Sequence, residues 1–343
     1  IYTAHGRYRK ASAMFRSMKP HLQDMANLSP ASSAWTFLFV ALSCNPRQSV
    51  AAAVEELAMM RAAEVPVAVR LLARVLEVPP TGAPISRPQV QLAALEAIAD
   101  VAKHTKRDEL PELLEGTLLN CLSLAAQTHH VELAKAAWIM LKKKLAGSGR
   151  SPSLASYHCV IHARAGAGDI TGALRMVEQL EQDYPHHPEA WAPFPGLSSI
   201  VNKCSASTEQ VDIAYGSIED MAARNIPIST GMLNCILAAC AQIGDLPRLL
   251  ETYEAFPKLG LEPNTHTFNM LIMGAAGLRQ FDTIEVVRNE MSKTEVPMDK
   301  QTYEYLIDGS IKAHDTNKAL QTLDAMEKAG FSPSTRTVLN VIK

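Results

Sequence analysis

Apolar residues recur every 35 positions through the last part of this chain. Three columns in one register hold only apolar residues: Val201, Ile236, Leu271, Leu306 and Val341; Met221, Phe256, Met291 and Met326; and Ile226, Leu261, Val296 and Phe331. Because hydrophobic residues make up only 47% of the chain, this coincidence is not expected by chance. A period of this length predicts an array of small repeated units instead of one large core.

Two short helices are predicted in each unit. The segments "THTFNMLIMGAAG" and "FDTIEVVRNEM" place apolar residues at helical spacing: Phe268, Leu271, Ile272 and Ala275, then Phe281, Ile284, Val287 and Met291. Pro297 in the following "KTEVPMD" ends the pair. One such hairpin cannot bury its own apolar face, so neighbouring hairpins must stack. The sequence therefore predicts an all-α fold, a right-handed α-solenoid of stacked helix-turn-helix repeats with roughly eight to nine helical pairs.

The register divides this one continuous solenoid into two parts. Residues 1–114 are predicted to form degenerate helical repeats, with a Pro-rich loop at 77–88, and residues 115–343 to form clear repeats. The units of the second part lie at about 115–153, 154–188, 195–229, 230–264, 265–299 and 300–334, with a partial unit at 335–343.

Composition excludes several classes of protein. The longest apolar run, "AWTFLFVALSC" at 34–44, has eleven residues, whereas a membrane helix needs about 20, so we expect no membrane insertion. The six cysteines show no CxxC spacing and are expected to be reduced core residues. The formal net charge of −2 conceals an asymmetry, because residues 1–150 carry +6 and residues 151–343 carry −8.

Several stretches resemble the pentatricopeptide repeat family, whose units have 35 residues: "THTFNMLI", "KQTYEYLIDGSIKA", "TNKALQTLDAMEKAGFSPS" and "GMLNCILAACAQIGDLPRLLETYEAFPKLGLEPN". The resemblance is strongest over 195–343. Tetratricopeptide repeats have a period of 34 and a different Trp, Leu-Gly and Tyr pattern, neither of which occurs here. The resemblance implies binding of single-stranded RNA in a mitochondrion or chloroplast, with about one base read per repeat. No targeting segment is visible in a chain that starts at Ile1.

The family reads bases with the fifth and last residues of each unit. The resemblance places these residues at Asn234 and Asn264 in one unit, and at Asn269 and Asp299 in the next. It implies that the first pair favours cytosine and the second favours uracil. An amide offers both a donor and an acceptor to a pyrimidine edge, whereas an ionised Asp299 only accepts and can orient Asn269 or hold a water. Alternatively, the two amides hydrogen-bond between adjacent first helices.

The flanking units depart from the family's pattern. They offer Ser199 with Ser229, and Glu304 with Ser334, which are not usual reading pairs. The second residue of a unit normally supplies an apolar wedge between bases, and here Gly231, His266 and Gln301 hold that position. Of these residues, His266 can stack on a base.

The remaining candidates have simple structural interpretations. Lys142, Lys143 and Lys144 can contact RNA phosphates or an acidic protein, or lie solvated at a helix end. The pairs His129-His130 and His186-His187 lack partners at ligand spacing, so no metal is expected. "GAGD" at 166–169 lacks the residues of a phosphate loop and is predicted to be an inter-helix turn. Because the sequence holds no catalytic constellation, we expect neither an enzyme nor a cofactor.

Three functions remain open at this point. The first is an organellar helical-repeat protein that binds single-stranded RNA for its processing, stability or translation. The second is a scaffold in a large organellar assembly, such as a mitochondrial or chloroplast ribosome or polymerase, which contacts protein partners or ribosomal RNA with little sequence reading. The acidic later repeats favour the scaffold, and the family resemblance favours RNA reading. The third is a repeat arm attached to a catalytic domain outside this chain.

Overall fold

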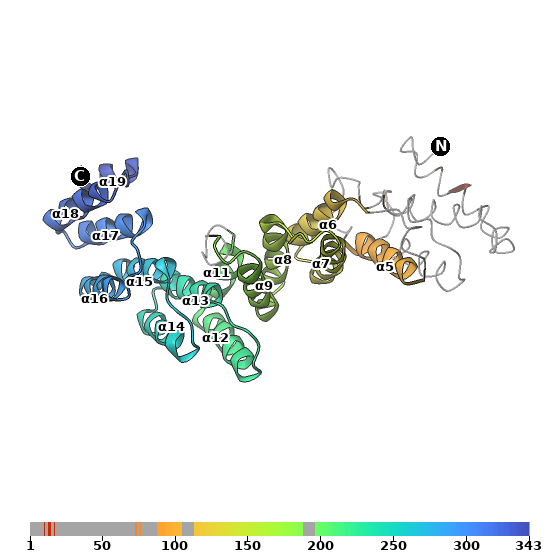
Figure 1. The fold of residues 1–343 in the computed structure, drawn as a ribbon, viewed down its shortest axis with the longest axis horizontal. Helices are drawn as coiled ribbons and strands as arrows, with labels where there is room; N and C mark the ends of the chain where they lie inside the picture. Colours follow the sequence, from red (N-terminus) through yellow and green to blue (C-terminus); the bar gives the residue numbers. More distant parts are fainter. Residues whose placement is uncertain are drawn as a thin grey trace. The chain divides into compact units, whose positions relative to one another are not determined.

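The computed structural model describes residues 88–104, 113–187 and 196–342, together with a few isolated positions before residue 88. Within these ranges it contains 14 helices and no strand (Figure 1). The all-α helical-repeat fold predicted from the sequence is therefore confirmed. Most of the predicted degenerate repeats in 1–114, and nearly all of the Pro-rich loop at 77–88, lie outside the described residues.

The chain divides into two compact units, residues 1–167 and 168–343, and each is described by itself. The described helices of the first unit are α5 (Pro88–His104), α6 (Glu115–Thr128), α7 (Val131–Ala146) and α8 (Leu154–Gly166). Helix α6 packs against α7 and α8, and α5 packs against α7. This arrangement is a stack of helical hairpins, as the periodicity predicts.

The second unit holds the regular part of the repeat. Its helices are α9 (Ile170–Asp183), α11 (Ser198–Cys204), α12 (Thr208–Ala223), α13 (Thr230–Ile243), α14 (Leu246–Lys258), α15 (Thr265–Gly277), α16 (Phe281–Lys293), α17 (Lys300–Lys312), α18 (Thr316–Lys328) and α19 (Thr335–Ile342). Helices α13, α15, α17 and α19 begin at intervals of 35 residues.

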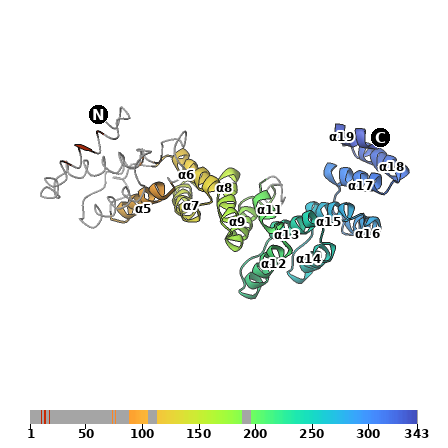
Figure 2. The same cartoon turned by 180° about the vertical axis from the view of Figure 1, so that it is seen from behind.

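Each repeat of the second unit has a first helix and a second helix with different surroundings. The first helices α11, α13, α15, α17 and α19 pack on one another in series, and the second helices α12, α14, α16 and α18 each pack against the first helix before them. Figure 1 and Figure 2 show α12 and α14 on the same edge of this stack, below α13 and α15. The first helices therefore form the interior of the stack.

This difference in surroundings explains the apolar pattern of the two helices. Helix α13 buries every residue from Gly231 to Cys240, because it has neighbours on several sides. Helix α16 buries only Ile284, Val287 and Met291, which form a single stripe. In the part of the chain that the structure describes, no helix is long and apolar enough to span a membrane.

Two local features fix the spacing of the helices. Asp245 and Asp315 cap the second helices α14 and α18 by accepting hydrogen bonds from the backbone N–H three residues later, at 3.1 and 3.0 Å. Gly274 lets α15 approach its neighbours closely, since a Cβ atom there would lie 2.7 Å from Leu249 Cδ2 and 3.2 Å from Ala241 Cβ. Capping and close packing thus set where each hairpin turns and how tightly hairpins stack.

Candidate nucleic-acid interface

A row of polar side chains follows the first helices of the second unit, with one joint at each contact between successive repeats. We call it the polar row. It consists of the fifth residues of four repeats and of the residues 30 positions later: Ser199 with Ser229, Asn234 with Asn264, Asn269 with Asp299, and Glu304 with Ser334. The later residue of each pair directly precedes a first helix, at the N-cap position, where Ser, Asn and Asp are preferred.

The joint between α13 and α15 is a closed set of hydrogen bonds. Asn234 Nδ2 donates to Asn264 Oδ1 at 3.3 Å, and Asn264 Oδ1 also accepts from Thr267 N at 3.0 Å. Thr267 Oγ1 donates to Asn234 Oδ1 at 2.8 Å and accepts from Asn264 N at 3.1 Å. The carbonyl of Asn234 is therefore occupied from within the protein.

The joint between α15 and α17 differs in one bond. Asn269 Nδ2 donates to Asp299 Oδ1 at 3.2 Å, which also accepts from Thr302 N at 2.7 Å and from Thr302 Oγ1 at 2.8 Å. Asn269 Oδ1 is buried and has no hydrogen-bond partner among the described residues. This atom, which we call the open carbonyl, is an acceptor that lacks a donor.

The two outer joints use other chemistry. At the α11 end, the Oγ atoms of Ser199 and Ser229 are buried, and neither has a partner within the described ranges. Met232 takes the place of the threonine there, and its Sδ accepts from Ser229 N at 3.4 Å. At the other end, Glu304 Oε1 accepts from Ser334 N at 3.1 Å. The asparagine joints are therefore chemically distinct from their neighbours.

The structure brings together the two predicted reading pairs but covers their amides. Asn234 and Asn269 are both 0% exposed, and each hydrogen-bonds to the cap of the next first helix. This geometry is the one expected of polar residues that join adjacent first helices. A base can reach either amide only when the side chains above it move aside.

The polar row contains two carboxylates and no lysine or arginine. Asp299 and Glu304 belong to it, and Glu181 Oε2 accepts from Gly231 N at 2.9 Å beside it. A small cavity of about 140 Å³ next to Glu304 is lined by Arg336 and by Asp308, which pairs with Lys312 Nζ at 2.8 Å. Burial lowers the pKa of His266, and the charge of Asp299 opposes this effect only in part. The row is thus acidic, and His266 is neutral at pH 7.

The predicted lysine cluster lies in the other unit. Lys142, Lys143 and Lys144 are in the last turns of α7, where cations complement the helix dipole. Lys142 Nζ lies 5.9 Å from the centroid of the Trp138 ring, and Lys143 is exposed. This placement fits the interpretation of a solvated helix end.

The pair His129-His130 lies where α6 ends and α7 begins. His129 ends α6 with a φ of 52°, and its ring centroid lies 5.2 Å from that of His162. His130 caps α7, because its Nδ1 accepts from Leu133 N at 3.1 Å. Within the described residues no three potential metal ligands come together.

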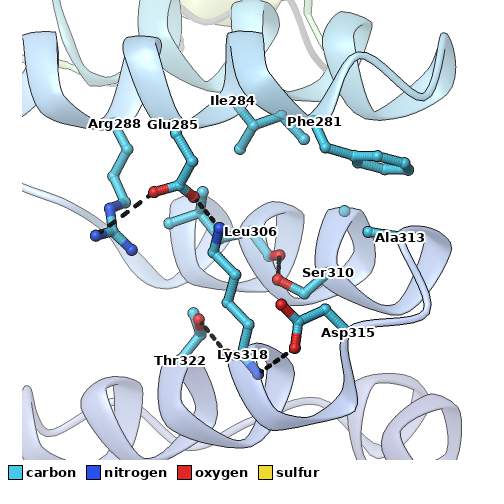
Figure 3. A pocket seen from close by; sticks show the side chains of 11 residues that line it. Phe281, Ile284, Glu285, Arg288, Leu306, Ser310, Ala313, Asp315, Lys318 and Thr322 are labelled. Atoms are coloured by element: carbon cyan, nitrogen blue, oxygen red, sulfur yellow. Dashed lines mark hydrogen bonds and ion pairs between the residues drawn. The ribbon is translucent and has the colours of Figure 1, made fainter.

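A hollow of about 110 Å³ lies between α16, α17 and α18, and Figure 3 shows its lining. Lys318 extends across it (Figure 3), so that its Nζ lies 2.5 Å from Glu285 Oε1, and Glu285 also pairs with Arg288 at 3.7 Å. Phe281 and Ile284 supply apolar contacts at its other end (Figure 3). Asp315 adds a second carboxylate to the lining, so two carboxylates balance two cations and the hollow presents no excess charge of either sign to a ligand.

The sequence interpretation did not find Thr267 and Thr302, the third residues of their repeats. Both are fully buried and belong to capping boxes with the N-cap residue. A signal for them exists, because an Asn or Asp followed three positions later by Thr at a helix start is a capping pattern. What the sequence does not reveal is that the same hydroxyls meet the polar row.

The fold and the polar row together define an α-helical repeat protein whose 35-residue hairpins, from α13 onward, are joined by polar contacts between first helices. A family model described as pentatricopeptide repeat-containing protein matches residues 115–256 and 270–343. The chain belongs to the pentatricopeptide repeat family, which confirms the resemblance drawn from the sequence.

Individual relatives share part of their length with this chain. A mitochondrial pentatricopeptide repeat-containing protein of Arabidopsis thaliana is 32% identical over 232 residues, covering 65% of this chain and 37% of that protein. A chloroplastic member from the same plant is 20% identical, covering 44% of this chain and 26% of its own length. The chain thus spans about a third, or less, of the curated relatives it matches.

Solved structures of the family are also similar. The crystal structure of the maize pentatricopeptide repeat protein PPR10 matches with 21% identity and a TM-score of 0.40, covering 92% of this chain and 46% of that chain. The same protein in complex with an 18-nt psaJ RNA element matches with 16% identity and a TM-score of 0.43, covering 99% and 51%.

Proposed function

We propose that this chain binds single-stranded RNA along the polar row, inside a mitochondrion or chloroplast, and so supports the processing, stability or translation of a transcript. Membership of the pentatricopeptide repeat family supports RNA as the ligand. The relatives named above as mitochondrial and chloroplastic support an organelle as the location.

The observation that carries this proposal is the open carbonyl of Asn269. A buried acceptor without a donor costs about 1–3 kcal/mol, so a ligand that donates an N–H there is favoured. Asp299 can only accept, and it therefore fixes the Asn269 amide with Nδ2 toward itself and Oδ1 directed elsewhere. A base whose ring N3 faces the open carbonyl must donate there, as uracil does from its N3–H; the ring N3 of cytosine accepts, and cytosine donates only from its exocyclic amine. We therefore assign uracil to Asn269 with Asp299, and we take Asn234 with Asn264 as the second reader.

The weaker candidates would contribute in other ways. His266 is neutral and lies one helical turn before Asn269, a position suited to stacking on a base. Ser199 offers a single hydroxyl. Lys142, Lys143 and Lys144 would contact phosphates outside the polar row. Because the row itself is acidic, we expect affinity to depend only weakly on salt when a short RNA covers the row alone.

The alternative, a scaffold subunit of an organellar ribosome or polymerase, is favoured by the acidic charge of residues 151–343. None of the relatives named above carries the name of such a subunit. We therefore propose RNA binding, and not a scaffold role, as the function of this chain.

Fluorescence anisotropy with single-stranded oligonucleotides tests the proposal. The intact chain should bind an adenosine oligonucleotide with a central pyrimidine pair more tightly than one without it. Asn269→Ala should weaken binding of the uridine-containing RNA by about tenfold, which corresponds to one hydrogen bond. Asn317→Ala is the matched control, because Asn317 is exposed on α18 and lies outside the polar row. If the intact chain bound none of these RNAs at low salt, the proposal would be wrong.

A further inference from the structure

Thr267 and Thr302 occupy the same place in successive repeats. Each is the third residue of its first helix, each is 0% exposed, and each Oγ1 accepts the N–H of its N-cap residue at 3.1 Å. A threonine hydroxyl has one proton to donate, so each side chain can satisfy only one strong acceptor. The two residues differ in the acceptor that receives this proton.

The identity of the N-cap residue decides the acceptor. In the first joint, Asn264 Oδ1 already accepts from Asn234 Nδ2 and from Thr267 N. The shortest contact of the Thr267 hydroxyl is therefore with Asn234 Oδ1, at 2.8 Å, and its contact with Asn264 Oδ1 is longer, at 3.1 Å. In the second joint the cap is the carboxylate of Asp299, which can accept several hydrogen bonds and receives the Thr302 hydroxyl at 2.8 Å.

We propose that Thr267 closes the carbonyl of Asn234 to a donating base, through the direction in which its hydroxyl proton points, whereas Thr302, whose proton goes to Asp299, leaves the carbonyl of Asn269 open. This inference rests on the proposed function. Thr267 fills the carbonyl of Asn234, so a base that must donate its ring N–H finds no acceptor in the repeat 230–264. Thr302 gives its proton to Asp299 and leaves the open carbonyl of Asn269 to the same donor in the repeat 265–299.

Thr267 is a positioning residue, because it is fully buried and acts through Asn234, whereas Thr302 donates to Asp299 instead. The effect of Thr267 on base preference is separable from the effect of losing a capping box. Replacement by valine keeps the shape of the side chain and removes the hydroxyl, so both variants lose one capping-box acceptor for the N-cap N–H. Only the Thr267 variant also changes an asparagine, since it turns the Asn234 carbonyl into a second open carbonyl.

The experiment compares two kinds of adenosine oligonucleotide by anisotropy with the intact chain. One kind carries a central uridine pair, and the other carries a mixed pair in both orders, cytidine-uridine and uridine-cytidine. The wild-type chain should bind the uridine pair about tenfold more weakly than the better mixed pair. Thr267→Val should bring this ratio to within about threefold by improving binding of the uridine pair. Thr302→Val should leave the ratio at its wild-type value.

Three further variants keep the test decisive. Thr267→Ser retains the hydroxyl and should keep the wild-type ratio. Asn264→Asp offers the Thr267 hydroxyl a carboxylate instead, so it should relax the ratio as Thr267→Val does, and it serves if the valine variant does not fold. Combining Asn264→Asp with Thr267→Val should add nothing further to the relaxation.

The outcomes separate this inference from the proposed function. If wild type binds these RNAs but neither Thr267→Val nor Asn264→Asp changes the ratio, the assignment to Thr267 is wrong and RNA binding stands. If Thr302→Val shifts the ratio as much as Thr267→Val, the effect is a general result of losing the capping box, and the inference is overturned. If no chain binds any RNA, both proposals fall together.

Discussion

The first helices and the second helices of the repeats contact the neighbouring repeats through two different kinds of polar interaction. Buried or part-buried hydrogen bonds join the first helices, as between Asn234 and Thr267, and they involve carboxylates only as acceptors, at Asp299 and Glu304. Exposed ion pairs join the second helices: Arg248 of α14 binds both carboxylate oxygens of Asp212 of α12, at 2.7 and 3.0 Å, and Lys318 binds Glu285 across the hollow of Figure 3.

This difference shows which contacts can determine how adjacent repeats pack and which contacts add only a small stabilisation. A buried hydrogen bond that loses one partner leaves an unsatisfied group without water, so its geometry is enforced. An exposed ion pair exchanges with water and salt at little cost. The register of the repeats is therefore set along the first helices, which are also the helices that carry the polar row.

The largest expected effect concerns apolar burial in the two classes of helix. Phe268 of α15 is 0% exposed and contacts the Tyr253 ring at a centroid distance of 5.9 Å. Phe268→Ala should lower the free energy of unfolding by about 3–5 kcal/mol, because it leaves a cavity in the stack. Phe281 of α16 is only half-buried, so Phe281→Ala should cost clearly less. Urea denaturation followed by circular dichroism measures both, and equal losses would contradict the contrast.

Much of this architecture follows from the sequence for a simple reason. The 35-residue period shows which positions are buried. Each repeat shows this in its own sequence, through apolar residues such as Leu271 and Ile284. The pairs Asn234–Asn264 and Asn269–Asp299 could be named because the family places them at fixed positions. The covering of the amides was not predictable, because it depends on how closely neighbouring first helices approach.

The direction of each threonine hydroxyl was beyond the sequence for a related reason. Thr267 and Thr302 are identical residues in identical positions of the repeat. What distinguishes them is a contact with an asparagine of the preceding repeat, more than 30 residues away, together with the charge of the N-cap residue. Whether the threonine donates its proton to the N-cap residue or to the asparagine can be seen only when the positions of all three side chains are known.

Replacing glycine by alanine should change the free energy of unfolding by an intermediate amount, with one sign in a first helix and the opposite sign in a second helix. In α15, Gly274→Ala puts a methyl group 2.7 Å from Leu249 Cδ2 and 3.2 Å from Ala241 Cβ, which should cost about 1–3 kcal/mol before a gain of up to about 1 kcal/mol in helix propensity. In α12, a methyl group added at Gly216 would have no described atom within 4 Å, so Gly216→Ala should stabilise the chain by about 0.5–1 kcal/mol. Thermal denaturation of both variants gives the two signs directly.

That experiment also tests whether the first helices are the tightly packed layer. A stabilising Gly274→Ala would mean that α13 and α15 can move apart without loss. A destabilising Gly216→Ala would mean that α12 is packed on its outer face as well. Either result would remove the distinction between the two layers.

The smallest effect should come from the ion pair between α12 and α14, and salt and pH reveal it best. Hydrogen bonds from the Arg248 guanidinium hold the pKa of the Asp212 carboxyl below its ordinary value, and the small effect of burial opposes them. A carboxyl with a lowered pKa in the folded state contributes stability above its ordinary pKa and loses it as the pH falls below about 4. Asp212→Asn should therefore lower the melting temperature slightly at pH 7 and low salt, and by less in 1 M salt or as the pH falls below about 4.

Asn234→Ala supplies the contrast for this last measurement. The groups in its joint are uncharged, so the loss of stability that it causes should be the same in low and high salt and should not change between pH 7 and pH 5. If instead salt removed the cost of Asn234→Ala and spared that of Asp212→Asn, the outer ion pairs would be the contacts that hold the repeats in register. The buried polar row would then be free to rearrange when a base enters it.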